Sequence, residues 1–551
     1  MKSAVTAVSN RRARARACRL GCCFGRVLLL LLASMASIMA QTTTNFTATL
    51  EIRDQGADTY ARVFVGNGAV GNLGSALLIL NRNQNLGDDY NSGVGPVGGS
   101  LTLAFNRQDQ ITMSIGPNPD PEAATVTLPA TVSGTGAFAG ATGPAGTRVT
   151  LTRTSLSPLT YSVRFIGPAT VGGQPLDLAI TDVPVVLATT NITVADNQTG
   201  TAVFTPFGNA TISGRSRPDT NRWDDSLNFI EISITFTFSQ ADSLRAFLTF
   251  DAKTEQPSPI LIAGGTGRFA GASGTAMITN IVDGNGGEPA RVTIAGTLTQ
   301  AGPTTPIITF VNTTSGLNQI AQNDWIEIKG TNLVPRTTPA GGMFWSNAPE
   351  FAQGRMPTEL GGISVTVNGK PAYVYWFCSA ATTPDCPTDQ INVLTPLDDY
   401  VGLVQIVVKN GSETSAPFLR FKNPAMPTFL LFSAKGHAVA THLDGSLLGP
   451  ATLFPGASTP ARRGETITLW GVGFGLPTTP LTDGSSTQRG SLPATLSCTL
   501  GGSPVQVASA LISPGLYQFN VTVSDNMAAG ERHFYCTYGE FLTLGVLVAV
   551  Q

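Results

Sequence analysis

Histidine, cysteine and charged residues are all scarce in this sequence. The 551 residues include three histidines and seven cysteines, and Asp, Glu, Lys and Arg together make up 12% of the chain, well below the usual quarter or so. Neither the H-E-x-x-H metal motif nor the G-x-S-x-G nucleophile elbow occurs. The centres that these motifs build are excluded, and we assign no catalytic residue, no metal ligand and no cofactor.

Basic residues cluster only at the start of the chain. Residues 1–26 carry seven Lys and Arg and no acid, and Val27–Ala40 is an apolar run of 14 residues that ends in small side chains. Such a run is too short to span a bilayer and is typical of a secretory signal peptide. We therefore expect residues 1–40 to be removed on export to the periplasm, cell surface or medium, leaving no transmembrane anchor.

The mature chain lacks any basic patch. It keeps 26 Lys and Arg against 35 Asp and Glu, a net charge near −9. Nucleic acid is therefore excluded as a partner, because binding to its phosphates needs a positive surface.

Four cysteines remain in the mature chain. They allow three pairings, of which Cys378–Cys386 with Cys498–Cys536 is the choice that is local in sequence. An oxidising compartment favours disulfides. A zinc site is the competing interpretation, but the spacings do not fit and no histidine lies beside these cysteines.

A ten-residue glycine-rich motif occurs twice, 131 residues apart. Its shared positions are Gly134, Gly136, Phe138, Gly140 and Gly143 in the first copy, and Gly265, Gly267, Phe269, Gly271 and Gly274 in the second. Glycine permits positive φ and close backbone approach, and the phenylalanine can anchor the turn in a core. We interpret the motif as a strand-to-strand corner. A phosphate cradle is disfavoured because no helical pattern follows it.

Residues 45–300 consist of short alternating segments separated by turn residues, with almost no helical periodicity. This pattern predicts an all-β fold, and aligning the two motifs divides it into repeats at 45–172 and 173–300. The Gly-Thr-Gly-x-Phe-x-x-Ala-x-Gly run resembles the signature turn of dirigent and allene oxide cyclase barrels. The resemblance implies two small eight-stranded antiparallel barrels, or sandwiches of similar size. It carries over no catalytic residue.

A second duplication follows the Pro/Thr-rich linker 301–306. Trp325–Leu333 is repeated by Thr466–Phe474, and Gln390–Val393 by Gln518–Val521. With Leu360–Val365 and Gly515–Val521, these segments resemble the uncharacterised tandem C-terminal domain of secreted acidobacterial proteins, and their Ile-x-Ile-x-Gly-x-x-Leu element resembles the start of IPT/TIG domains. The resemblance implies immunoglobulin-like β-sandwiches at 307–423 and 424–551, and no activity.

One aromatic strand is a possible contact surface. In Tyr373-Val374-Tyr375-Trp376-Phe377, alternation places Tyr373, Tyr375 and Phe377 on one face. A row facing the core is the simpler interpretation, and an exposed aromatic platform for sugar or peptide, including Trp376, is the functional one. The acidic pairs Asp88-Asp89, Asp224-Asp225 and Asp398-Asp399 are interpreted as solvated turns and not as calcium loops.

Two classes of function fit these observations. The first is a secreted, non-catalytic binding, adhesion or scaffold protein whose partner is an unknown extracellular protein or glycan. The alternative is a small-ligand-binding or isomerase-like barrel pair carried on immunoglobulin-like spacers. A hollow barrel would favour the second class, and a barrel filled by side chains would favour the first.

Overall fold

The computed structural model describes residues 42–55, 59–85, 98–118, 123–156, 159–165, 167–193, 196–218, 229–251, 256–257, 259–282, 288–314, 319–539 and 541–551. The predicted signal peptide lies outside these residues. In the described part of the chain, β-strands dominate and every helical segment is a three-residue 3-10 turn, none of which could span a membrane. The all-β prediction is confirmed, with two closed barrels followed by two pairs of packed sheets.

The first barrel is an eight-stranded antiparallel meander. Its strands pair in the order β11-β2-β3-β4-β5-β6-β7-β8. Their bounds are β2 Thr59–Val70, β3 Gly74–Asn85, β4 Gly99–Ala104, β5 Gln110–Ile115, β6 Thr125–Thr135, β7 Arg148–Leu156, β8 Leu159–Phe165 and β11 Ile180–Thr193, with a small hairpin, β9 Pro168–Val171 and β10 Gln174–Asp177, before β11.

The second barrel closes in the same way around a strand from the start of the chain. Its strands pair in the order β1-β12-β13-β14-β15-β17-β18-β19, and β19 returns to β1. Their bounds are β1 Thr42–Gln55, β12 Asp196–Thr205, β13 Gly208–Pro218, β14 Phe229–Thr237, β15 Ser243–Asp251, β17 Ile260–Thr266, β18 Ser273–Val282 and β19 Ala290–Gln300, with β16 Gln256–Pro257 beside β15.

The barrels exchange one strand each, so their limits differ from the predicted repeats 45–172 and 173–300. β1 belongs to the first repeat but pairs with β12 and β19 of the second. β11 belongs to the second repeat but pairs with β2 and β8 of the first. The physical reason is chain order: β11 follows β8 directly after one hairpin, and neighbouring strands in sequence tend to pair. Sequence similarity alone could not show this exchange.

Side chains fill both barrels. The first encloses a cluster that includes Phe64, Leu101, Met113 and Phe165, each fully buried or nearly so. The second encloses Phe46, Phe204 and Phe236, which pack in tilted and edge-on contacts, and Phe269, which packs on Phe207 and Phe238. Burying each such ring stabilises the fold by about 1.5–3 kcal/mol. The described interiors of both barrels are therefore packed with side chains.

The glycine motif forms the same turn in both barrels. A 3-10 turn spans Gly136–Phe138 in one and Gly267–Phe269 in the other, and φ is +59° at Gly136 and +56° at Gly267. In each copy an aspartate accepts the next backbone N–H: Asp109 from Ala137 at 2.7 Å, and Asp242 from Arg268 at 3.1 Å. A Cβ on either glycine would come within 2.3 Å of that carboxylate, which explains the requirement for glycine.

The first sandwich runs from Ile307 to Asn423. One sheet pairs β20-β22-β28-β27-β23, and the other pairs β21-β31-β29-β25-β24 with β26 and β30 at its margins. Their bounds are β20 Ile307–Thr313, β21 Ile320–Ala321, β22 Trp325–Thr331, β23 Met343–Phe344, β24 Glu359–Leu360, β25 Ile363–Val367, β26 Lys370–Pro371, β27 Tyr373–Cys378, β28 Asp389–Leu394, β29 Gly402–Asn410, β30 Glu413–Thr414 and β31 Phe418–Asn423.

The second sandwich has the same plan. One sheet pairs β35-β34-β33-β36-β40-β39 with β32, and the other pairs β38-β37-β41-β42 with β43. Their bounds are β32 Thr428–Phe429, β33 Ala440–His442, β34 Leu447–Leu448, β35 Ser458–Thr459, β36 Thr466–Val472, β37 Leu496–Leu500, β38 Ser503–Val505, β39 Val507–Ser513, β40 Leu516–Thr522, β41 Gly530–Tyr538, β42 Phe541–Leu542 and β43 Val546–Val550.

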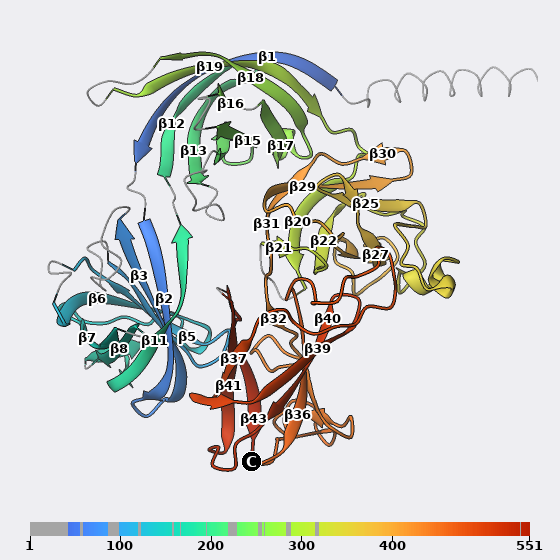
Figure 1. The fold of residues 1–551 in the computed structure, drawn as a ribbon. Coiled ribbons are helices and arrows are strands. Elements are labelled where there is room, and N and C mark those ends of the chain that lie inside the picture. The colour runs from blue at the N-terminus through green and yellow to red at the C-terminus, as the bar shows by residue number, and fades with distance from the viewer. Residues whose placement is uncertain are drawn as a thin grey trace, which may run out of the picture.

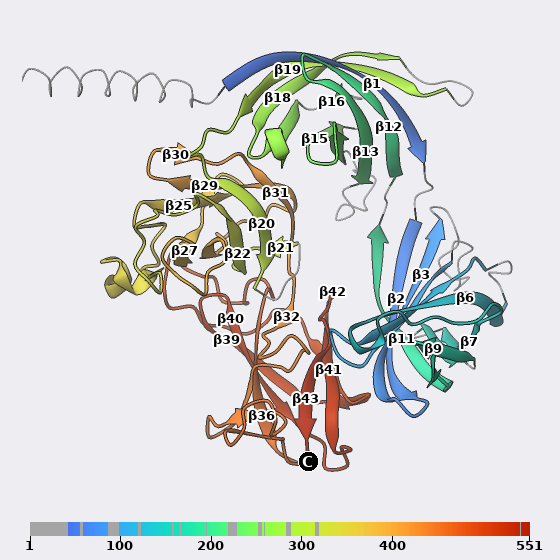
Figure 2. The ribbon, with the colours of Figure 1, turned by 180° about the vertical axis from the view of Figure 1, so that it is seen from behind.

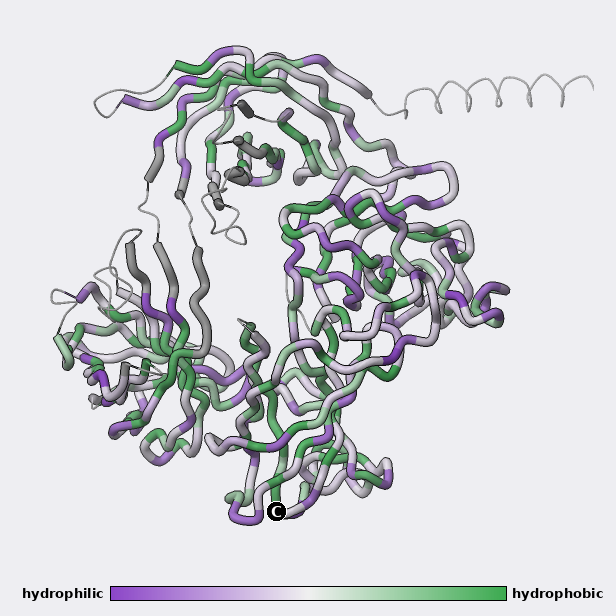
Figure 3. The backbone as a smooth tube through the Cα atoms, viewed as in Figure 1, coloured by the Kyte–Doolittle hydropathy of each residue, from purple (hydrophilic) through white to green (hydrophobic). Residues whose placement is uncertain are grey.

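The four modules lie around a ring, with the second barrel opposite the second sandwich (Figure 1, Figure 2). The outer face of the first barrel closes the ring, because Val63, Val65 and Leu77 pack against Tyr535 and Leu542 of the second sandwich. Hydrophobic and hydrophilic residues interleave along the strands (Figure 3). Strand β43, whose five residues are all hydrophobic, is buried along its whole length.

Candidate functional site

Six aromatic side chains gather on the outer face of the first sandwich. They are Trp325 on β22, Phe344 on β23, Trp345 and Phe351 in the two 3-10 turns η4 (Trp345–Asn347) and η5 (Phe351–Gln353), and Tyr375 and Trp376 on β27. We call this set the aromatic face. It holds three of the five tryptophans in the chain.

A β-bulge in β27 builds the aromatic face. The pairing of β27 with β28 shifts between Val374 and Trp376, so Tyr375 is an extra residue. The bulge leaves both Tyr375 and Trp376 partly exposed and turns Phe377 into the sandwich core, where it is 1% exposed. The predicted row of Tyr373, Tyr375 and Phe377 on one face is therefore wrong at Phe377. A bulge re-aims side chains in this way, and strict alternation cannot anticipate it.

The rings contact one another in a connected patch. Tyr375 lies edge-on to Trp325 and Trp345, with ring centres 5.2 and 4.9 Å apart. Trp345 stacks on Phe351 at 4.9 Å, and Phe344, which is 41% exposed, bridges Tyr375 and Trp376. Mutual packing fixes these rings while their outer surfaces remain open to solvent.

Polar side chains continue the aromatic face across the sheet. Glu327 on β22 lies opposite Asn392 on β28, which in turn lies opposite Trp376 on β27. The amide of Gln390 donates to Asn392 at 2.8 Å, and Glu327 pairs with Lys329 at 3.0 Å. The row thus offers amide and carboxylate groups that can donate to and accept from a hydroxyl-rich ligand.

Two hydrogen bonds to the second sandwich hold residues in and beside the aromatic face. The Trp325 indole donates to the carbonyl of Pro514 at 2.9 Å, and the Tyr373 hydroxyl donates to Asp483. Burial, and then the bond to Asp483, raises the pKa of Tyr373. Tyr373 is only 5% exposed, so this predicted contact residue positions the surface and does not itself present a ring to solvent.

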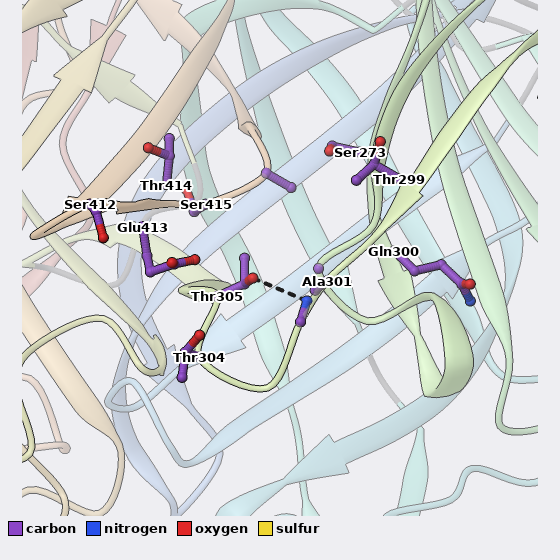
Figure 4. Close-up of a pocket in the computed structure, with 13 residues that line it drawn as sticks. Ser273, Thr299, Gln300, Ala301, Thr304, Thr305, Ser412, Glu413, Thr414 and Ser415 are labelled. Carbon is purple, nitrogen blue, oxygen red and sulfur yellow. Dashed lines mark hydrogen bonds between the residues drawn. The ribbon is translucent and has the colours of Figure 1, made fainter. Parts of the chain in front are cut away.

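A second, hydroxyl-lined cleft lies between the second barrel and the first sandwich (Figure 4). It has a volume of about 790 Å³. Its walls are the ends of β18 and β19, the linker, and the β29–β30 hairpin; the polar side chains are Ser273, Thr299, Gln300, Thr304, Thr305, Ser412, Glu413, Thr414 and Ser415. Glu413 is the one charged residue among those lining the cleft, so the cleft has no acid–base pair.

Among the described residues, a histidine meets both a hydroxyl and a carboxylate at two places. At the first, Nε2 of His442 lies 2.9 Å from Thr459 Oγ1, and Nδ1 lies 2.5 Å from Glu465. The second involves His437. Ser433 Oγ lies 2.8 Å from Nδ1 of His437, whose Nε2 lies 2.5 Å from Glu531. The bond from His437 lowers the pKa of Glu531. These three residues connect a turn to β41, and the adjacent cavity of about 210 Å³ is lined by Lys435, His533 and Leu547 instead. Ser433, His437 and Glu531 do not line that cavity.

The first barrel contains buried cations that the sequence pattern did not reveal. Arg62 and Arg82 lie opposite each other on β2 and β3 and are 5% and 0% exposed. Burial lowers the pKa of Arg82 to about 10 and raises the pKa of nearby Tyr161 to about 12. The alternation of side chains along the strands could have revealed this burial. Arg62 lies on the same face of β2 as the buried Phe64, and Arg82 lies on the same face of β3 as the buried Leu80.

Two disulfides join Cys378 to Cys386 and Cys498 to Cys536, with Cα atoms 6.4 and 4.0 Å apart. Among the described residues, no group of three His, Cys, Asp or Glu is arranged to hold a metal ion. Asp398 instead pairs with Lys370 at 3.0 Å and with Lys422 at 3.6 Å. The pairs Asp88-Asp89 and Asp224-Asp225 lie outside the described residues.

No protein-family model and no curated protein matches the sequence. One solved structure with some likeness is the Bacteroides ovatus mixed-linkage glucan utilization locus protein SGBP-B in complex with a mixed-linkage heptasaccharide. The match has a TM-score of 0.25 and 11% identity, and it covers 58% of this chain and 63% of that chain, under two thirds of its length. A superposition this poor shows neither a shared fold nor a shared ligand.

Proposed function

We propose that this protein is an exported, non-catalytic binding protein that holds a glycan against the aromatic face of its first sandwich, which we assign to the IPT/TIG-like class. The proposal rests on the connected patch of Tyr375, Trp376, Phe344 and Trp345. Beside this patch lie two polar residues on neighbouring strands, Glu327 and Asn392. Aromatic surface flanked by a few polar groups suits a ligand with both apolar and hydroxyl-bearing faces. A pyranose ring has both.

Two features that are typical of exported proteins support the same proposal. Two disulfides are typical of proteins exposed to an oxidising environment, and the basic-then-apolar start of the sequence is typical of an export signal. Extracellular glycans are available to such a protein.

Affinity electrophoresis of the mature chain in gels that contain neutral polysaccharides tests the proposal. Wild type should be retarded by at least one polysaccharide, and Tyr375→Ala or Trp376→Ala should weaken binding by about tenfold or more, since central aromatic contacts dominate interfaces. Tyr375→Phe keeps the ring and should bind nearly normally. Trp470→Ala removes a tryptophan from the corresponding sheet of the second sandwich and is the matched control. Equal retardation of all variants would contradict the proposal.

A further inference from the structure

The cleft between the second barrel and the first sandwich has the chemistry of a second ligand site. Its walls come from three separate stretches: Gly271–Ser273 with Thr299–Gln300, the linker 301–305, and the hairpin 412–416. Volumes of 300–1,000 Å³ are typical of small-molecule sites, and the observed 790 Å³ falls within that range.

Three of the lining side chains are positioned by local hydrogen bonds. The Thr305 hydroxyl accepts from the Gly302 amide at 3.1 Å, the bond drawn in Figure 4. The Ser415 hydroxyl accepts from the Val408 amide at 3.0 Å, and the Gln300 amide donates to the Arg268 carbonyl at 3.0 Å. These bonds reduce the entropy that the walls would lose on binding a ligand.

The composition of the walls selects the ligand class. Seven serine and threonine residues line the cleft, and a hydroxyl can both donate and accept. The apolar side chains present are those of Ala301 and Ala416, too small to anchor an apolar or peptide side chain. Glu413 repels anions and can accept from two neighbouring hydroxyls at once. In Figure 4 it projects toward the linker, into the space between the walls.

We infer that this cleft binds a short neutral saccharide segment, which it holds between the second barrel and the first sandwich. The inference rests on the proposed glycan function and adds a second site on the same chain. A polymer that reaches both sites would bind with higher avidity than either site gives alone.

Isothermal titration calorimetry of the mature chain with cellohexaose, maltohexaose and xylohexaose, and with anionic hexagalacturonate, tests the inference. Wild type should bind two molecules of at least one neutral hexasaccharide and should reject hexagalacturonate. Glu413→Gln should weaken one site by about tenfold or more, since hydrogen bonds to a charged acceptor are strong. Thr304→Trp should abolish that site by filling the cleft. Glu359→Gln, an exposed acid on β24 of the same sandwich, is the matched control and should change neither site.

The variants separate the two sites. In Tyr375→Ala/Trp376→Ala, one site should remain and should disappear on adding Thr304→Trp. Hydrogen exchange should then show saccharide-dependent protection of residues 299–305 and 412–416. A single wild-type site that only the aromatic substitutions remove would overturn the cleft and leave the proposed function standing. A single site that only the cleft substitutions remove would overturn the aromatic face and support the cleft. Failure of every neutral saccharide to bind wild type would contradict both.

Discussion

The barrel pair and the sandwich pair each contain a repeated sequence motif, yet their strands are arranged differently. Each barrel takes its closing strand from the other repeat, β1 in one case and β11 in the other. In each sandwich, all strands of both sheets come from the same segment of the chain. The two sandwiches contact each other through buried amides, where Asn323 and Gln488 exchange hydrogen bonds of 2.9 and 3.0 Å. The barrels are thus interlocked along the chain, whereas the sandwiches are joined through an interface.

Within the sandwich pair, the shared scaffold contrasts with the divergent surface. Gln390 and Asn392 bond each other on β28 as Gln518 and Asn520 do on β40, at 2.8 and 2.9 Å. The insertion with η4 and η5 carries Trp345 and Phe351 in the first copy. The two sandwiches therefore share the register of these strands. They differ in the 3-10 turns η4 and η5 and in the position of the bulge, which falls at Tyr375 in β27 and between Leu511 and Ser513 in β39.

The largest expected effect is the disulfide cross-linking that tests the exchange of β1 between the barrels. Thr49 on β1 lies opposite Thr293 on β19 of the second barrel, so Thr49→Cys/Thr293→Cys should form a disulfide in nearly all molecules under mild oxidation. Gel mobility and peptide mapping measure the cross-link.

The matched pair is Thr49→Cys/Ser162→Cys. By the 131-residue offset, Ser162 on β8 is the counterpart of Thr293 in the first barrel, where β1 would pair if no strand were exchanged. This pair should stay reduced. The reverse outcome, a cross-link in Thr49→Cys/Ser162→Cys and none in Thr49→Cys/Thr293→Cys, would show that each repeat closes its own barrel.

Much of this architecture could be predicted from the sequence, because alternation and repeats report local structure and common descent. Gly136 and Gly267 mark equivalent turns, and the four cysteines pair locally. Which barrel β1 closes depends on competition between two similar partners, which no local pattern encodes. The bulge at Tyr375 likewise adds one residue without a glycine or proline to announce it.

The two disulfides should contribute unequally to the two sandwiches. Cys498 and Cys536 are 38 residues apart, and Cys378 and Cys386 are eight apart. In the chain-entropy account, removing the longer link by Cys498→Ala/Cys536→Ala should cost about 4 kcal/mol, against about 2.5 kcal/mol for Cys378→Ala/Cys386→Ala. Hydrogen exchange resolved by module measures each loss. A larger loss in the first sandwich would contradict the loop-length argument.

Asp324 should make the stability of the first sandwich depend on pH. Burial raises the pKa of this carboxyl to about 8. The protonated carboxyl therefore contributes fully to the free energy of unfolding below the pKa of the unfolded chain, and this contribution is lost as pH rises through about 8. Wild type should lose about 2–3 kcal/mol between pH 4 and pH 8, less than the full shift would give because buried sites relax around a charge. Asp324→Asn should flatten this slope in urea titrations.

Glu465 is the control for this titration, because it occupies the position in the second sandwich equivalent to Asp324. Its backbone carbonyl accepts from Val523 at 2.8 Å, as that of Asp324 accepts from Thr395 at 2.9 Å. Glu465→Gln should leave the slope of the first sandwich unchanged. An equal slope in wild type and Asp324→Asn would show that the buried carboxyl is not its source.

The smallest effect is expected at the junction beneath the aromatic face. Tyr373→Phe removes the hydroxyl that donates to Asp483 of the second sandwich and should cost about 1 kcal/mol, measured by the shift of the urea midpoint. The ring remains, so saccharide affinity should change by less than about threefold. A large loss of affinity would mean that the Tyr373 hydroxyl contacts the ligand.

Tryptophan fluorescence tests the glycan-binding aromatic face most directly. Replacing Trp223 and Trp470 by phenylalanine leaves Trp325, Trp345 and Trp376 as the emitting tryptophans. Titration of this variant with the polysaccharide that retards wild type should shift and saturate the emission, with the same midpoint as the retardation. Addition of Tyr375→Ala should move that midpoint about tenfold or more higher. Saturating retardation with unchanged emission would place the ligand elsewhere and contradict the account.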